Sequence, residues 1–145
     1  MKLWPVTGLL MGALLTVESA LANNALSLYT AEYKTKVAGL SVTLTRTLAE
    51  ENGRYHLTQG GKKGFMVKLS EESHFSVEGD RIVGERFVYE LSGVSNRRRE
   101  VLFDEAAGTI RSLKKKVWTE YPWSPDVLDR LSQQEQMRLK LLLAQ

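Results

Sequence analysis

The stretch VWTEYPWSPDVLDRLSQQEQMRLKLLLAQ, residues 117–145, decides the fold because it holds the one strong helix signal outside the N-terminal segment. Ser124 has the side chain of an N-cap, and Pro125 suits the first helical position. An apolar stripe follows at helical spacing: Leu128, Leu131, Leu139 and Leu142. Residues 26–118 are typical of strands and turns, so we expect the helix to lay this stripe on an antiparallel sheet, since neither layer buries its apolar face alone.

Glu135 interrupts the apolar stripe, with Arg138 beside it. Three arrangements are open: Glu135 reaches solvent, Glu135 pairs with Arg138, or the helix bends within residues 133–136. The helix ends on leucines that surround most of its circumference: Leu139, Leu141, Leu142 and Leu143. Free termini are usually polar, so we expect these leucines to contact either a second copy of the chain or further strands of a longer protein.

Alternation of apolar and polar side chains predicts about seven strands. They are expected at residues 26–37, 40–48, 54–59, 67–77, 81–91, 97–104 and 109–118. Short turns such as Asn52-Gly53 join them, which indicates a mainly β (α+β) antiparallel meander with one C-terminal helix. The glycine-rich segment 60–64 lacks the spacing of a phosphate-binding loop, so we expect a flexible connection, after which Phe65, Met66 and Val67 return the chain to the core.

Residues 1–22 have the features of a secretory signal peptide: Lys2, a mostly apolar segment at 3–17, and the small residues of Ala20-Leu21-Ala22. The apolar segment is shorter than the roughly 20 residues of a membrane span, which makes an uncleaved anchor the weaker alternative. We therefore expect cleavage after Ala22 and a soluble periplasmic protein with a single domain at residues 23–145. The chain has no cysteine and a net charge of +3, which excludes disulfides and does not indicate nucleic-acid binding.

Six basic residues gather at one end of the hairpin predicted for residues 97–118. If Asp104 pairs with Thr109, three pairs of cations lie opposite each other: Arg99 and Lys114, Arg98 and Lys115, Arg97 and Lys116. Like charges directly opposite destabilise a sheet, so this concentration indicates either a bound anion or exposure to solvent. The six residues form a candidate site for lipopolysaccharide phosphates, acidic lipid headgroups or an acidic protein. The alternative is a solvated edge hairpin whose charges prevent aggregation.

Other candidate sites are weaker. Trp118, Tyr121 and Trp123 either line an apolar cleft or cap the core where the sheet meets the helix. His56 and His74 lie in different strands without metal-binding spacing, and no sequence feature places a carboxylate beside either one. No serine elbow or cysteine nucleophile is present. The sequence therefore predicts no catalytic residue, no metal and no cofactor.

The order of several motifs resembles the bacterial periplasmic family called domain of unknown function 3108. After the export signal, these motifs are LSVTLTRTL, NGRYHL, FDEAAGTI and SPDVLDRLSQQEQMRL, and the resemblance spans residues 29–142. It implies a curved, half-barrel-like antiparallel sheet in an exported protein without assigned activity, cofactor or catalytic residues. Members of the family generally continue past the helix with further strands, so the chain resembles the N-terminal part of a longer member.

The expected function is a non-catalytic binding or scaffolding role in the bacterial cell envelope. A carrier of hydrophobic envelope ligands, such as lipid or lipoprotein, is the alternative, with the ligand between the concave face of the sheet and the helix. An enzyme of unknown class is the third hypothesis. The expected partners are envelope lipid, lipopolysaccharide or another envelope protein.

Overall fold

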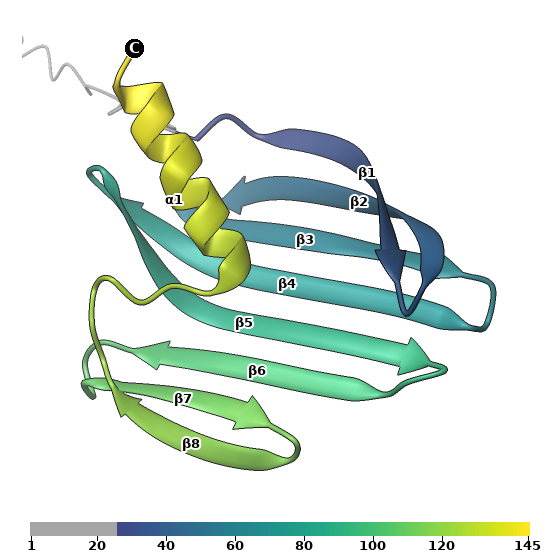
Figure 1. Cartoon of the computed structure of the whole chain (residues 1–145). Coiled ribbons are helices and arrows are strands. Elements are labelled where there is room, and N and C mark those ends of the chain that lie inside the picture. The colour runs from purple at the N-terminus through teal and green to yellow at the C-terminus, as the bar shows by residue number, and fades with distance from the viewer. Residues whose placement is uncertain (1–25) are drawn as a thin grey trace, which may run out of the picture.

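The computed structural model describes residues 26–145, which form one open antiparallel sheet of eight strands and one helix (Figure 1). The elements are β1 (Tyr29–Val37), β2 (Leu40–Glu51), β3 (Arg54–Lys63), β4 (Val67–Glu78), β5 (Arg81–Gly93), β6 (Arg97–Asp104), β7 (Thr109–Lys114), β8 (Val117–Pro122) and α1 (Arg130–Leu143). Each strand pairs with the next along the chain. The predicted class, a mainly β, half-barrel-like meander with a C-terminal helix, is confirmed. The expected signal peptide at residues 1–22 lies outside the described residues.

Helix α1 crosses one face of the sheet over β4 and β5 (Figure 1). The residues of β4 that face the helix are buried, and they alternate with partly exposed residues on the outer face. The core between sheet and helix contains Leu26, Leu48, Tyr55, Leu57, Phe75, Ile82, Phe87, Leu131 and Leu139. These side chains fill the position that the carrier hypothesis gave to a hydrophobic ligand.

A second apolar cluster lies where the β1–β2 hairpin folds over the inner face of the sheet: Val42, Leu44, Val67, Leu69 and Leu91. The prediction of a flexible connection at residues 60–64 is wrong, because Gly60 and Gly61 belong to β3. The pairing of β2 with β3 begins at Thr45 and Gly60, and β2 crosses β3 beside Gly61. The missing side chain of Gly61 leaves room for the carbonyl oxygen of Thr43.

The expected last strand, residues 109–118, is two strands joined by a tight turn at Lys115 and Lys116. Both lysines have positive φ, 50° and 62°, the conformation that Asn-Gly usually supplies in a two-residue hairpin. Neither lysine gives a turn signal in the sequence, so β8 was not predicted.

The predicted register of the β6–β7 hairpin is confirmed up to this turn. The observed pairs include Asp104 with Thr109, Phe103 with Ile110, and Arg99 with Lys114. The pairs Arg98 with Lys115 and Arg97 with Lys116 are wrong, since the chain turns away into β8 after Lys114. The cations still share one end of the sheet.

Helix α1 begins at Arg130, and Asp129 is its N-cap. The Asp129 carboxylate accepts hydrogen bonds from two backbone amides of the first turn, each at 3.0 Å. It also accepts one from the Ser73 hydroxyl on β4 at 2.8 Å. The prediction of Ser124 as the N-cap is wrong, because the bond to the sheet selects Asp129 over the local signal.

We expect Asp129→Ala to lower the free energy of unfolding by about 2 kcal/mol, the upper end for an N-cap, because the Ser73 hydroxyl also loses its partner. Ser124→Ala is the control, with an expected change within about 0.5 kcal/mol. Urea unfolding measures both. An equal loss in the two variants would mean that the helix begins at Ser124.

The leucines at the end of α1 divide between the core and solvent. Leu139 is buried and Leu142 packs against the core, whereas Leu141 and Leu143 are exposed. Self-association through this end stays a prediction, with only Leu141 and Leu143 available for it.

Within residues 26–145, no helix has the length and hydropathy that a bilayer span requires.

Candidate functional site

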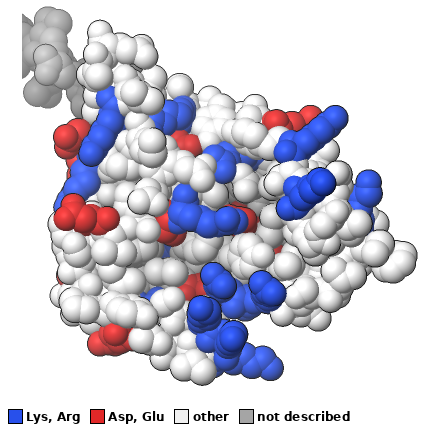
Figure 2. Space-filling view, in the orientation of Figure 1, with Lys and Arg blue, Asp and Glu red and all other residues white. Residues whose placement is uncertain are grey.

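The six residues of the candidate anion site line one cleft with a volume of about 930 Å³. We call it the basic cleft, and its cations are these six, Arg97, Arg98, Arg99, Lys114, Lys115 and Lys116, together with Lys68 on β4, which the sequence did not single out. Leu91 and Leu113 add apolar surface, and Ser92 and Asn96 lie on the side toward the β5–β6 turn. Figure 2 shows the gathering of Lys and Arg side chains over the β7–β8 turn. The structure therefore brings together the residues that the sequence singled out.

Most of the charge in the basic cleft is uncompensated. Arg98 pairs with Glu90 and with Glu100, the latter at 2.9 Å. Burial raises the pKa of Glu100, but hydrogen bonds from Arg86 and Arg98 outweigh it and lower that pKa below its ordinary value. None of the other six cations forms an ion pair with a carboxylate among the described residues. The cleft thus presents a positive field to an anion.

The turn beside the cleft is strained. A left-handed conformation costs a residue with a side chain about 1–2 kcal/mol, and both Lys115 and Lys116 adopt it. The three other two-residue hairpin turns among the described residues, Ala38-Gly39, Asn52-Gly53 and Gly79-Asp80, each contain a glycine with positive φ. Strained residues gather at functional sites, so two cations kept in this turn favour a binding role.

An exposed apolar group lies at the neighbouring turns. Phe65 is 94% exposed, and Met66 and Val94 are also exposed. The Val94 amide donates a hydrogen bond to the Met66 carbonyl at 2.8 Å, which joins the β3–β4 turn to the β5–β6 turn. We call Phe65, Met66 and Val94 the apolar tip. The prediction that Phe65, Met66 and Val67 return the chain to the core is confirmed for Val67, which is buried, and wrong for Phe65 and Met66.

The three aromatic residues of the second candidate site do not share a cleft. Trp118 lies opposite Leu113 and Tyr121 opposite Ile110, so the two side chains are on opposite faces of β8. Trp118 contacts a guanidinium, that of Arg111, 4.9 Å from its ring centre. Trp123 lies at the junction of sheet and helix, in a small crevice lined also by Phe103 and Leu128. The apolar-cleft hypothesis is therefore wrong for this set.

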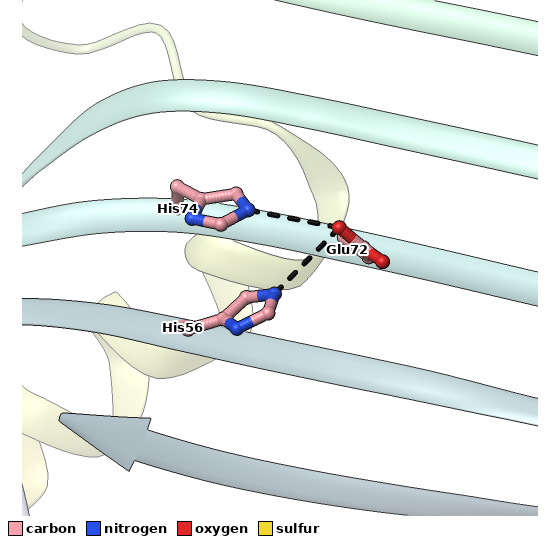
Figure 3. A group of neighbouring side chains, drawn as sticks. All are labelled: His56, Glu72 and His74. Carbon is pink, nitrogen blue, oxygen red and sulfur yellow. Dashed lines mark ion pairs between the residues drawn. The ribbon is translucent and has the colours of Figure 1, made fainter.

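Three side chains converge on the outer face of the sheet (Figure 3). His56 on β3 lies directly opposite His74 on β4, and their stacked rings have centroids 4.1 Å apart. Glu72 precedes His74 by two residues on the same face, and its Oε2 lies 3.7 Å from the Nε2 atom of each histidine. We call these three residues the outer-face cluster. The expectation that no carboxylate lies beside either histidine is wrong, because the β3–β4 register supplies one.

Two buried carboxylates fix α1 on the inner face. Glu71 is fully buried and forms an ion pair with Arg130. Glu135 is also buried, accepts a hydrogen bond from the Tyr29 hydroxyl at 2.5 Å and pairs with Arg138 at 2.5 Å. The predicted Glu135–Arg138 pair is confirmed, and the alternative of Glu135 in solvent is wrong. Burial, then the hydrogen bond to Glu135, raises the pKa of Tyr29 to about 12, so the phenol keeps the proton that it donates.

Comparison with protein-family models, with curated proteins and with solved structures found no match. The resemblance to domain of unknown function 3108 stays a prediction from the sequence motifs.

Proposed function

We propose that the protein is a non-catalytic binding module of the cell envelope whose basic cleft binds phosphate groups of anionic envelope lipids. The observation that carries this proposal is the group of six cations around a cleft of about 930 Å³ that have no carboxylate partner within residues 26–145. Guanidinium and ammonium groups bind phosphate oxygens through charge-assisted hydrogen bonds. Export to the periplasm, expected from residues 1–22, would bring the cleft to such lipids.

The apolar tip favours a lipid surface over an acidic protein as the source of phosphate. Ser92 and Asn96, which line the basic cleft, flank Val94 of the tip along the chain, so the two features are neighbours. Basic residues attract a protein to an anionic membrane surface, and exposed apolar side chains then insert among the headgroups. Phe65 is suited to this insertion because almost none of its side chain is buried in the protein.

We expect the triple variant Arg97→Gln/Arg99→Gln/Lys114→Gln to bind phosphatidylglycerol-containing vesicles at least about tenfold more weakly, since each basic residue near an anionic surface contributes about 1 kcal/mol. Vesicle co-sedimentation at low and high salt measures this affinity, and salt should weaken wild-type binding. Vesicles of phosphatidylcholine alone should not bind. A parallel titration with lipopolysaccharide distinguishes the two sources of lipid phosphate.

The control for this experiment is Lys34→Gln/Lys36→Gln/Lys140→Gln, which removes the same charge from exposed positions outside the cleft. It should keep most of the vesicle affinity. An equal loss of vesicle affinity in both triple variants would show that binding depends on net charge alone. That result would contradict binding at a specific cleft.

A second variant separates binding from folding. Lys115→Asn/Lys116→Gly gives the turn residues that its conformation favours, so we expect the free energy of unfolding to rise by about 1–2 kcal/mol. The same change removes two cleft cations, so vesicle affinity should fall. Urea unfolding and co-sedimentation measure the two effects. A stabilised variant with undiminished binding would show that the turn lysines do not serve the ligand.

A further inference from the structure

We propose that the outer-face cluster binds a divalent transition-metal ion of the Zn²⁺ class through Nε2 of His56, Nε2 of His74 and a carboxylate oxygen of Glu72. Two imidazoles and one carboxylate form a ligand set that Zn²⁺ takes where a fourth position stays open to water. Imidazole nitrogen also excludes the harder ions Mg²⁺ and Ca²⁺, which prefer oxygen. The cluster shares no residue with the basic cleft, so the two proposals stand independently.

The positions of the three atoms fit such an ion. With bonds of about 2.0–2.2 Å, the ligand atoms of a tetrahedral Zn²⁺ site are roughly 3.3–3.6 Å apart. Both Nε2–Oε2 distances here are 3.7 Å, and the three side chains offer ligand atoms within 4.8 Å of one another. Small side-chain rotations close the remaining difference, and the backbone need not move.

One ring nitrogen of His56 on β3 has no hydrogen-bond partner within residues 26–145. Nε2 of His56 is buried, and no hydrogen bond to it is formed among the described residues. Glu72, at 3.7 Å, is beyond hydrogen-bond distance. Buried polar atoms without a partner are rare in native proteins, and an ion is one of the few explanations. The three side chains as a whole are partly exposed, which leaves a path for the ion and room for a water ligand.

The sheet holds the ligands in place and keeps competing charge away. His56 and His74 are direct partners in an uninterrupted stretch of β3–β4 pairing. Arg86 lies opposite His74 on the other side, but its guanidinium pairs with Glu100 on β6 at 3.0 Å. The nearest cross-strand cation is therefore already neutralised and directed toward β6.

Isothermal titration of the untagged full chain with Zn²⁺ tests the proposal. The chain has only two histidines, so a polyhistidine tag would mask the result. We expect one ion per chain, a higher melting temperature with Zn²⁺, and neither effect with Mg²⁺. Co²⁺ in place of Zn²⁺ should give the visible absorption bands of a four-coordinate ion.

The variants His56→Gln and His74→Gln should each bind Zn²⁺ at least about tenfold more weakly and lose the Co²⁺ bands. Glu72→Gln, which keeps both imidazoles, should also weaken binding. Glu78→Gln is the matched control, since it removes an exposed carboxylate from the same strand outside the cluster. Melting temperatures without metal confirm that each variant is folded. A wild-type chain without Zn²⁺ binding, or unchanged affinity in both histidine variants, overturns the proposal.

Discussion

The Arg130→Ala variant is expected to be less stable than the wild type by about 3 kcal/mol, because it leaves the buried Glu71 carboxylate without its counter-charge. Neither oxygen of Glu71 accepts a hydrogen bond among the described residues, so the ion pair is the stabilising contact seen for this charge. This loss of stability is at the low end of the range for breaking a buried ion pair, because the Arg130 side chain is about half exposed and water can partly replace it. Urea unfolding measures the loss.

The decisive comparison is the double variant Arg130→Ala/Glu71→Gln. A neutral Gln at position 71 needs no counter-charge, so we expect most of the lost stability to return. Arg54→Ala is the control, because Arg54 belongs to an exposed ion pair with Glu85 at 3.7 Å and should contribute less than about 0.5 kcal/mol. If the double variant is no more stable than Arg130→Ala, the cost comes from lost packing on Tyr89, whose ring lies 5.6 Å from the guanidinium carbon.

Gly61→Ala is expected to cost about 3 kcal/mol, the upper end for overpacking. A Cβ atom at this position would overlap the backbone carbonyl oxygen of Thr43 and come within 3.0 Å of the Leu44 side chain. The backbone of the β1–β2 hairpin would have to move away from the sheet, which also opens the second apolar cluster. Thermal unfolding measures the loss.

Gly60→Ala provides the comparison from the same strand. Its Cβ would come within 3.1 Å of the carbonyl oxygen of Leu69, so a shift of a few tenths of an ångström relieves the contact. We expect a clearly smaller loss than for Gly61→Ala. Similar small losses in both variants would mean that the hairpin does not press on β3 at Gly61.

Each surface of the sheet has a separate role in these proposals. The inner face is structural: Glu71 and Ser73 on β4 bind the first residues of the helix, Arg130 and Asp129. The outer face holds the cluster proposed for metal, and one end of the sheet holds the basic cleft. Ligands at either site would leave the core undisturbed, which suits a binding module.

Much of the fold follows from local patterns. The two-residue alternation placed β4, β5 and β6 to within a few residues, because the side-chain period of a strand is independent of its neighbours. The loop from Glu105 to Gly108 set the β6–β7 register, and with it the pairing of Arg99 with Lys114. Six cations of the basic cleft could therefore be predicted by residue, whereas Lys68 joins them only through the pairing of distant strands.

Other features depend on contacts between distant residues. Asp129 replaced Ser124 as the N-cap because the sheet supplied a hydrogen bond that no local signal shows. The outer-face cluster was not predicted because His56 meets Glu72 and His74 only through the β3–β4 register. The loop expected at residues 60–64 shortened the predicted third strand, so the β3–β4 register could not be predicted.

The sequence by itself determined the strand faces, the position of the helix along the chain to within one or two turns, and six of the cations that line the cleft. These depend on side-chain period, turn residues and charge, which are local properties. Only the tertiary structure decided which carboxylates are buried, where the helix begins and which side chains meet across strands. Those outcomes depend on register and burial, because a buried charge such as Glu71 is stable only beside a partner that the folded chain brings to it.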